Sequence, residues 1–234
     1  MKRIFDLSLS IIGVFFLLPI FGVFSFLVWI QDKNSPFYYA TRVGKDNKIF
    51  TMVKIRSMII DADKKGGEST SDNDSRITNI GKIIRKYKID ELTQLFNVIK
   101  GNMSLVGPRP NTINGVKAYT QDEMKLLSVR PGITDFSSIV FSDEGEILAN
   151  SKDPDNDYDI LIRPWKSRLG IIYIDNMSIL LDVKIIFFTV TSIFSKTKAL
   201  AFVTEQLKNL GTKENIVEVC KRKKELVPSM PPGA

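Results

Sequence analysis

The N-terminal stretch LSLSIIGVFFLLPIFGVFSFLVWI, residues 7–30, decides how this chain is organised. No charged side chain lies between Asp6 and Asp32, and about 20 apolar residues suffice to cross the hydrocarbon core of a bilayer. The stretch has no small-x-small cleavage site before Trp29, so it is a poor signal peptide. A buried helix of a soluble protein is the alternative, but the run is long for a helix without a polar face. We therefore predict that residues 1–33 insert into a membrane.

Two features bear on how this segment sits in the bilayer. Lys2 and Arg3 indicate that the N-terminus stays in the cytoplasm. Pro19, close to the middle of the run, removes one backbone donor and obstructs the preceding turn. A kink there would make a re-entrant helix with both ends on one face of the membrane, whereas a spanning helix with a tolerated proline would not. The residues alone leave both topologies open.

The composition of the whole chain limits its chemistry. Its 234 residues carry a net charge of +7 and give a pI of about 9.3, so an anionic partner is expected: nucleic acid, a phosphorylated ligand or an acidic lipid surface. The chain has no histidine and one cysteine, Cys220, which excludes an intrachain disulfide framework. Acid, base or nucleophile chemistry must therefore fall mainly on Asp, Glu, Lys, Tyr, Ser or Thr.

Residues 34–195 are predicted to form a mixed α/β domain. The patterns of apolar, β-branched and turn residues predict a strand, a turn, a second strand, a loop and a helix, in that order, over residues 35–43, 44–47, 48–58, 61–74 and about 77–88. On the second strand Lys54 and Arg56 would share one face, because side chains alternate along a strand.

The adjacent carboxylates Asp90 and Glu91 are the strongest candidates for chemistry. Arg85 and two lysines precede them, and the apolar stripe that follows predicts an amphipathic helix from Asp90 to Gly101. Asp90 alone is readily explained as an N-cap that accepts hydrogen bonds from the first free amides. The same position suits a nucleophile, because a helix N-terminus keeps a carboxylate ionised and offers amides to a phosphate.

Two proline-bounded arginines are candidate phosphate contacts. In residues 107–110, GPRP, the prolines hold Arg109 in an extended backbone, which suits bidentate recognition of phosphate oxygens. In residues 130–132, RPG, Arg130 enters a predicted type II turn. Solvated arginines in ordinary turns are the alternative for each site taken alone.

The last third of the chain carries less signal. Residues 163–176 can form a helix, and the strongly apolar residues 179–195 are short for a membrane span. We expect residues 179–195 to form a helix that lies in the membrane interface or packs on the first segment. Residues 196–234 are predicted as a basic, partly disordered tail, because lysines and prolines are frequent there.

Four motifs occur in a fixed order: KIRSM at 54–58, DELTQLFN at 90–97, KGNMSLVGPRP at 100–110 and RPGIT at 130–134. With the N-terminal apolar segment they resemble the bacterial sugar transferase family, the monotopic polyprenyl-phosphate phosphoglycosyl transferases, over roughly residues 1–195. The resemblance implies transfer of a sugar 1-phosphate from a UDP-sugar to undecaprenyl phosphate with release of UMP, the first membrane step of capsule, O-antigen or glycoprotein synthesis. It also implies Mg²⁺, a covalent phosphosugar intermediate, a re-entrant membrane helix and amphipathic helices on the inner leaflet.

Carried over residue by residue, the resemblance makes Asp90 the nucleophile and a Mg²⁺ ligand, and Glu91 the carboxylate that assists it. Lys54, Arg85 and Arg109 would contact phosphates or order the site. The protein is then expected at the cytoplasmic face of the bacterial inner membrane, with a UDP-sugar, undecaprenyl phosphate and membrane lipids as partners and no nucleic acid; homodimerisation stays open. The alternative is a membrane-anchored basic binding module without catalysis, which explains the charge and the anchor but not the carboxylate pair.

Three features depart from the family pattern. Many members have Ser-Pro at the membrane break where this chain has Leu18 and Pro19, which loses a hydroxyl able to satisfy freed backbone groups. Many also have an Asp where this chain has Gly170. The segment after Thr134 differs from the commonest family sequence, so the identity of the sugar cannot be carried over.

Overall fold

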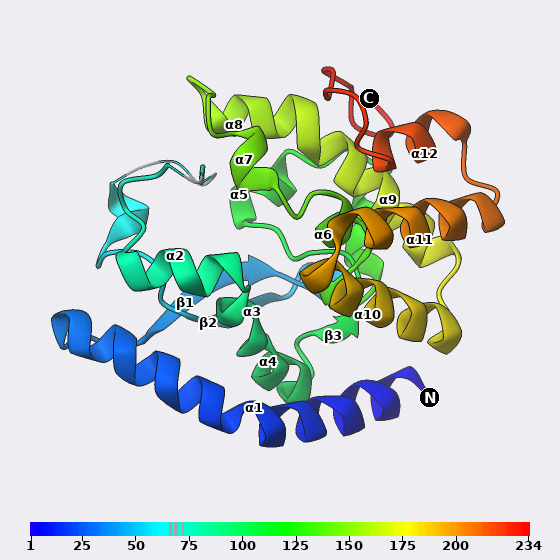
Figure 1. Cartoon of the computed structure of the whole chain (residues 1–234). Coiled ribbons are helices and arrows are strands. Elements are labelled where there is room, and N and C mark those ends of the chain that lie inside the picture. The colour runs from blue at the N-terminus through cyan, green and yellow to red at the C-terminus, as the bar shows by residue number, and fades with distance from the viewer. Residues whose placement is uncertain (66, 68–69, 72) are drawn as a thin grey trace.

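The computed structural model describes residues 1–65, 67, 70, 71 and 73–234. A long N-terminal helix, α1 (Lys2–Asp32), lies along one side of the rest of the chain, in which two small two-stranded sheets lie among helices (Figure 1). The prediction of a mixed α/β fold with an apolar N-terminal helix is confirmed. Residues 66, 68, 69 and 72, which belong to the predicted loop 61–74, lie outside the described residues.

The anchor helix α1 runs through Pro19 without a break and changes direction near its middle (Figure 1). A proline inside a helix removes one hydrogen bond and crowds the preceding turn, which accounts for a bend. The 31 residues span about 46 Å at 1.5 Å per residue. In the described part of the chain, α1 is the one helix long and apolar enough to cross a membrane.

Both ends of α1 are fastened to the same body. Near its start, Arg3 donates hydrogen bonds of 2.5 and 2.9 Å to two carbonyls close to the end of α4 (Gln94–Lys100). At its other end, Asp32 accepts two hydrogen bonds of 2.5 and 2.7 Å from Arg56. Arg56, which the sequence pairs with Lys54 on one strand face, therefore holds the end of the anchor helix.

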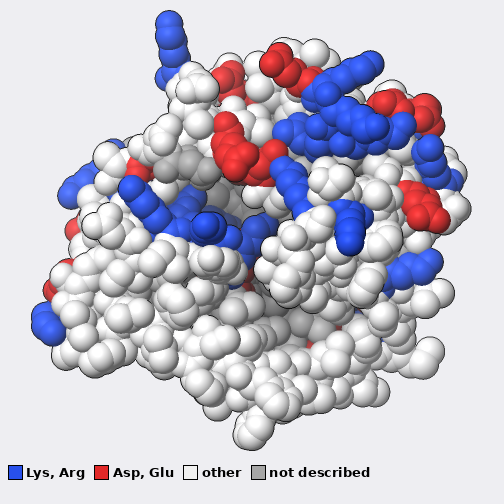
Figure 2. All heavy atoms as spheres, viewed as in Figure 1, with Lys and Arg blue, Asp and Glu red and all other residues white. Residues whose placement is uncertain are grey.

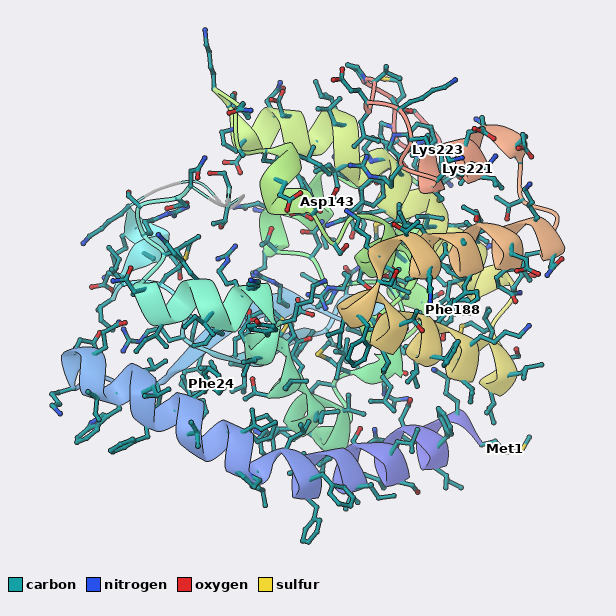
Figure 3. The ribbon with its side chains drawn as sticks, viewed as in Figure 1. Met1, Phe24, Asp143, Phe188, Lys221 and Lys223 are labelled. Atoms are coloured by element: carbon teal, nitrogen blue, oxygen red, sulfur yellow. The ribbon has the colours of Figure 1, made fainter. Side chains whose placement is uncertain are left out.

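One face of α1 is apolar and uncovered, and the other is packed. The exposed large apolar side chains of its central part are Leu9, Ile11, Ile12, Phe15, Phe16, Leu18, Ile20, Val23, Phe26, Leu27, Trp29 and Ile30. On the packed face Phe21 and Val28 are buried, and Phe24, labelled in Figure 3, packs against the same cluster. That cluster includes Ile84 and Ile89, and Ile89 directly precedes the carboxylate pair in sequence.

The first half of the body contains a hairpin and three short helices: β1 (Phe37–Val43), β2 (Ile49–Ile55), α2 (Asn79–Lys86), α3 (Ile89–Leu92) and α4. The predicted hairpin is confirmed, since β1 and β2 pair antiparallel with Phe37 opposite Ile55. Asn97 ties α4 to this hairpin, because its side chain accepts a 3.0 Å hydrogen bond from the Val53 amide and donates a 2.7 Å bond to the Thr51 carbonyl. The hairpin and the carboxylate pair are thus held in a fixed relation.

A second, parallel sheet joins β3 (Ser104–Val106) to β4 (Gly132–Thr134). A Cβ atom at Gly132 would lie 2.1 Å from the Gly107 nitrogen. The backbone segments at Gly107 and Gly132 therefore lie closer together than any side chain at position 132 would permit. Gly132 has no left-handed backbone conformation, and a type II turn requires one at its third residue. The prediction of a type II turn at residues 130–132 is therefore wrong. Gly132 instead allows the close approach of its strand to Gly107.

The larger core lies in the C-terminal half, among α6 (Phe136–Val140), α9 (Arg163–Asp175), α10 (Ile179–Phe194), α11 (Lys196–Asn209) and α12 (Glu214–Cys220). The helices predicted over 163–176 and 179–195 are confirmed as α9 and α10. Phe188 of α10, labelled in Figure 3, stacks on Phe202 of α11 with ring centroids 5.6 Å apart. The exposed side of α10 carries an apolar stripe of Leu180, Val183, Phe187, Val190 and Phe194.

The chain after residue 195 differs from the predicted tail. Leu200, Val203 and Leu207 lie on one face of α11 and are buried in the larger core. Their helical spacing is difficult to recognise in the sequence because many lysines surround them. The last residues also contact the body, since Arg168 donates a 2.6 Å hydrogen bond to the Met230 carbonyl. Cys220, which ends α12, is 1% exposed, and burial raises the pKa of its thiol to about 12.

The remaining elements are short connections: η1 (Lys45–Asn47), η2 (Ala62–Lys64), α5 (Ile113–Lys117), η3 (Glu123–Ser128), α7 (Glu144–Ile147), α8 (Pro154–Asp157) and η4 (Tyr158–Ile162).

Candidate active site

The turn before α3 sets the position of the carboxylate pair. Lys88 adopts a left-handed backbone conformation (φ 53°, ψ 31°), so it is the N-cap residue, and Asp90 and Glu91 fall in the first turn of α3. No hydrogen bond from a backbone amide to the Asp90 carboxylate occurs among the described residues. The interpretation of Asp90 as an N-cap is therefore wrong, although Gly101 ends the helical run with φ 90° as predicted.

Asp90 is a buried carboxylate whose negative charge has few partners. Its residue exposure is 9%, and its nearest cation is Lys54, whose Nζ lies 3.7 Å from Oδ2. Burial raises the pKa of Asp90 above its usual value and Glu91 adds to the rise, while Lys54 and Arg85 act in the opposite direction. A carboxylate in this state has free lone pairs for an incoming ligand.

Glu91, by contrast, is fully engaged. Both of its oxygens accept hydrogen bonds from Arg109, at 2.7 and 3.2 Å. Burial works against the charged carboxylate, but Arg109, Lys54 and Lys88 outweigh it and hold the pKa of Glu91 at about 2. The fork of Arg109 that the sequence assigns to phosphate is therefore occupied by Glu91 in this structure, and Arg109 also donates to the Ile133 carbonyl in the middle of β4.

Lys88 and Arg85 complete the basic surroundings of the pair. Lys88 reaches across to the second half of the molecule, where its Nζ lies 3.5 Å from the Ser138 carbonyl of α6. Burial lowers the pKa of Lys88 despite the opposing effect of Glu91. Arg85, on the last turn of α2, is close enough to act on the charge of Asp90.

Arg130 does not join this group. Its Nε donates a 2.8 Å hydrogen bond to the Gly101 carbonyl, which lies about 16 Å beyond Asp90 along the helical run at 1.5 Å per residue. The structure therefore brings Lys54, Arg85 and Arg109 to the carboxylate pair and places Arg130 at the far end of α4.

The second half adds charged residues that the sequence motifs do not single out. Asp135 is 1% exposed and caps α6, accepting a 2.7 Å hydrogen bond from the Ser138 amide. Burial raises the pKa of Asp135, while Arg109 and Lys166 lower it. The capping-box spacing of Asp135 and Ser138 is readable in the sequence, whereas the approach of Lys166 from α9 depends on the fold.

Gln94 is a further residue that the sequence does not identify. It has no exposed surface, and neither its amide nitrogen nor its amide oxygen has a hydrogen-bond partner among the described residues. It lies three and four residues after Glu91 and Asp90, which places it on the same side of the helical run. A buried amide without a partner costs free energy, which makes Gln94 a candidate for contact with a bound ligand.

Gly170 occupies the position at which the resemblance leads one to expect an Asp. A Cβ atom there would lie 2.7 Å from a methyl carbon of Leu126 and 3.4 Å from Cβ of Pro108. The space for a larger side chain is thus filled, and α9 packs closely against the proline before Arg109.

The face of the molecule seen in Figure 2 has an open hollow. Figure 2 shows Lys and Arg side chains gathered around a depression in the middle of this face, with acidic side chains on its rim. A basic depression with a carboxylate of raised pKa can bind an anion and offer it a nucleophile.

The carboxylates also fit a divalent cation bound together with a phosphate. Among the described residues, no group of three or more His, Cys, Asp or Glu side chains could form a cage for a metal. Mg²⁺ in phosphate sites commonly uses one or two carboxylates with substrate oxygens and water, and the buried Asp90 has the free oxygen that this requires.

Comparisons with known proteins agree with this geometry. The family model "Bacterial sugar transferase" matches residues 1–196. A putative undecaprenyl-phosphate N-acetylgalactosaminyl 1-phosphate transferase of Bacillus subtilis is 47% identical over 109 residues, 47% of this chain and 61% of the relative. A UDP-N-acetylgalactosamine-undecaprenyl-phosphate N-acetylgalactosaminephosphotransferase of Aeromonas hydrophila is 32% identical over 83% of this chain and 44% of the relative.

A shorter relative is matched over most of both chains. The uncharacterized sugar transferase EpsL of Bacillus subtilis is 35% identical over 82% of this chain and 87% of the relative, whereas this chain spans only about half the length of the two transferases above. The motif order, the carboxylate pair beside its arginine and the match over residues 1–196 lead to one conclusion. The chain belongs to the bacterial sugar transferase family.

Proposed function

We propose that this protein transfers a sugar 1-phosphate from a UDP-sugar to undecaprenyl phosphate through a covalent intermediate on Asp90, with release of UMP. The observation that carries the proposal is the buried, under-partnered Asp90 beside Lys54 and the Glu91–Arg109 pair. The names of the relatives support the acceptor and the reaction class.

In the first half-reaction, a carboxylate oxygen of Asp90 attacks the phosphorus that carries the sugar. A bond forms between that oxygen and phosphorus, the bond from phosphorus to the bridging oxygen breaks, and UMP leaves with the bridging oxygen. Lys54, Arg85 and Lys88 offset the repulsion between an anionic nucleophile and an anionic diphosphate. Mg²⁺, held by Asp90 with phosphate oxygens, would supply further charge neutralisation.

In the second half-reaction, a phosphate oxygen of undecaprenyl phosphate attacks the same phosphorus. The bond from phosphorus to Asp90 breaks, which restores the carboxylate and leaves the sugar on a lipid diphosphate. Glu91 stays ionised near neutral pH, so it can hold Arg109 in place while the acceptor attacks. One site then serves a soluble donor and a lipid acceptor in turn.

We infer that α1 enters and leaves the membrane on one face. A straight spanning helix carries its two ends to opposite faces, whereas both ends of α1 are tied to the same body by Arg3 and by the pair of Asp32 and Arg56. The uncovered apolar face would then lie in the inner leaflet, with the basic hollow exposed to the cytoplasm. This arrangement supports a position at the cytoplasmic face of the inner membrane.

The test is to trap the adduct. Wild-type protein in nanodiscs, incubated with Mg²⁺ and UDP-sugars without lipid acceptor, should gain the mass of one sugar phosphate, release one UMP, and lose the adduct when undecaprenyl phosphate is added. Peptide mapping should place the adduct on Asp90.

Two variants sharpen this test. Asp90→Asn should fold and form no adduct, while Glu91→Gln should keep the attachment point and slow one or both half-reactions. An active Asp90→Asn protein would overturn the covalent mechanism. A wild type that binds anionic vesicles but releases no UMP from any UDP-sugar would favour the basic binding module instead.

A further inference from the structure

A charged cluster between α7 and α9 has no part in the mechanism described above. Lys166 of α9 forms an ion pair with Glu144 at the start of α7, and its Nζ lies 5.0 Å from the centre of the Tyr158 ring. These three residues are here called the far wall.

The far wall stands close to the catalytic cations. Lys166 interacts electrostatically with Arg109 and with Lys88, and Lys88 itself reaches the second half of the molecule at Ser138. The side chains of Lys166 and Glu144 are 21% and 32% exposed, so both remain accessible to a ligand. Lys88 contacts α6, and α6 leads to α7 and packs against α9, so the far wall lies on the side of the carboxylate pair that faces α6.

The chemistry of the far wall differs from that of a phosphate site. Glu144 contacts Lys166 through Oε2, and among the described residues its Oε1 has no hydrogen bond. A free carboxylate oxygen repels phosphate but accepts hydrogen bonds from hydroxyl groups. Lys166 supplies donors, and Tyr158 supplies a hydroxyl and an apolar ring. Acceptor, donor and ring together match a neutral polyhydroxylated ligand.

We propose that Glu144, Lys166 and Tyr158 bind the hexose of the donor and determine which sugar is accepted. This inference rests on the proposed function. The hexose stays on the reacting phosphorus through both half-reactions, so the residues that recognise it must lie within one sugar ring of Asp90. Uridine leaves after the first half-reaction and is bound elsewhere in the hollow.

The experiment separates sugar binding from nucleotide binding. Calorimetry on Asp90→Asn protein in nanodiscs with Mg²⁺ measures the affinities for UDP and for UDP-glucose, UDP-galactose, UDP-N-acetylglucosamine and UDP-N-acetylgalactosamine. Adding Glu144→Gln or Lys166→Met should weaken the preferred UDP-sugar about 10- to 100-fold, the range for loss of a hydrogen bond to a charged group, and leave UDP unchanged.

The matched control is Asp175→Asn, which removes a partly exposed ion pair with Lys125 on another part of α9 and should change neither affinity. Thermal unfolding of each variant shows whether it is folded, and Glu144→Asp, which keeps the charge on a shorter side chain, should change the order of preference among the four sugars. Equal weakening of UDP and UDP-sugar would make the far wall a nucleotide site, and no change in either would make it structural. Failure of the proposed function is distinct, since wild type would then release no UMP with any donor.

Discussion

Lys54 controls the protonation of the proposed nucleophile. Burial raises the pKa of Asp90 and Lys54 is the strongest influence that lowers it, so a protonated, inactive Asp90 should accumulate as the pH falls through this pKa. The pKa of Glu91 is held at about 2, so Glu91 does not titrate in the same range. The acidic limb of the pH–rate profile should therefore belong to Asp90.

Replacing Lys54 by Met should move that limb to higher pH, because the cation that favours the carboxylate is gone. Activity at neutral pH should fall more than activity at alkaline pH. The measurement is kcat/KM for UMP release against pH, with the exposed Lys48→Met on the same hairpin as control. A lower plateau with an unmoved limb would mean that Lys54 acts on the phosphates alone.

Arg109 is required for its geometry as well as its charge. Its two terminal nitrogens hold both oxygens of Glu91 and also reach the Ile133 carbonyl, which one ammonium group cannot reproduce. Arg109→Lys should reduce turnover roughly 10²- to 10³-fold, a loss of about 2.7–4 kcal/mol of transition-state stabilisation. Near-normal single-turnover rates in the lysine variant would assign Arg109 to a purely structural turn.

At the scale of elements, the contact between Gly107 and Gly132 joins the two halves of the site. The two strands of the parallel sheet meet at this contact, and Arg109 follows two residues after Gly107. A methyl group at position 132 would meet the Gly107 nitrogen at 2.1 Å and force the strands apart.

Gly132→Ala should therefore destabilise the fold by about 1–3 kcal/mol, as overpacking commonly does, and lower Tm by roughly 2–4 °C per kcal/mol. Turnover should fall with it, because Arg109 moves. Gly22→Ala is the matched control, since no atom lies within 4 Å of its added methyl group. Equal Tm values for the two variants would show that the sheet tolerates the displacement.

Local sequence patterns predict where helices and strands lie better than they predict which residues contact one another in the fold. Alternating residues gave the hairpin, and Gly101 marked the end of α4. Arg109 and Arg130 look alike in sequence, yet the fold sends one to Glu91 and the other to the Gly101 carbonyl. Such a difference depends on contacts between residues far apart in the chain. The sequence of the tail conceals α11, because its lysines lower the mean hydropathy although Leu200, Val203 and Leu207 recur at helical spacing and are buried.

At the scale of the whole molecule, the clamped ends of α1 predict its topology. Cysteines placed at Ile4, which is 70% exposed, and at Lys33 should both react with a membrane-impermeant thiol reagent in inverted vesicles and neither in intact spheroplasts. Both positions lie on the same side only if α1 returns to the face that it entered. Labelling of position 33 alone from the outside would establish a spanning helix.

Cys220 makes this experiment unusually clean. The thiol is 1% exposed and its pKa is about 12, so almost none of it is the reactive thiolate at neutral pH. The natural chain should therefore give no background signal with maleimides or spin labels as long as it stays folded. Every single-cysteine variant, in α1 or around the hollow, can be made without first removing a native residue, and reaction at position 220 would itself report unfolding.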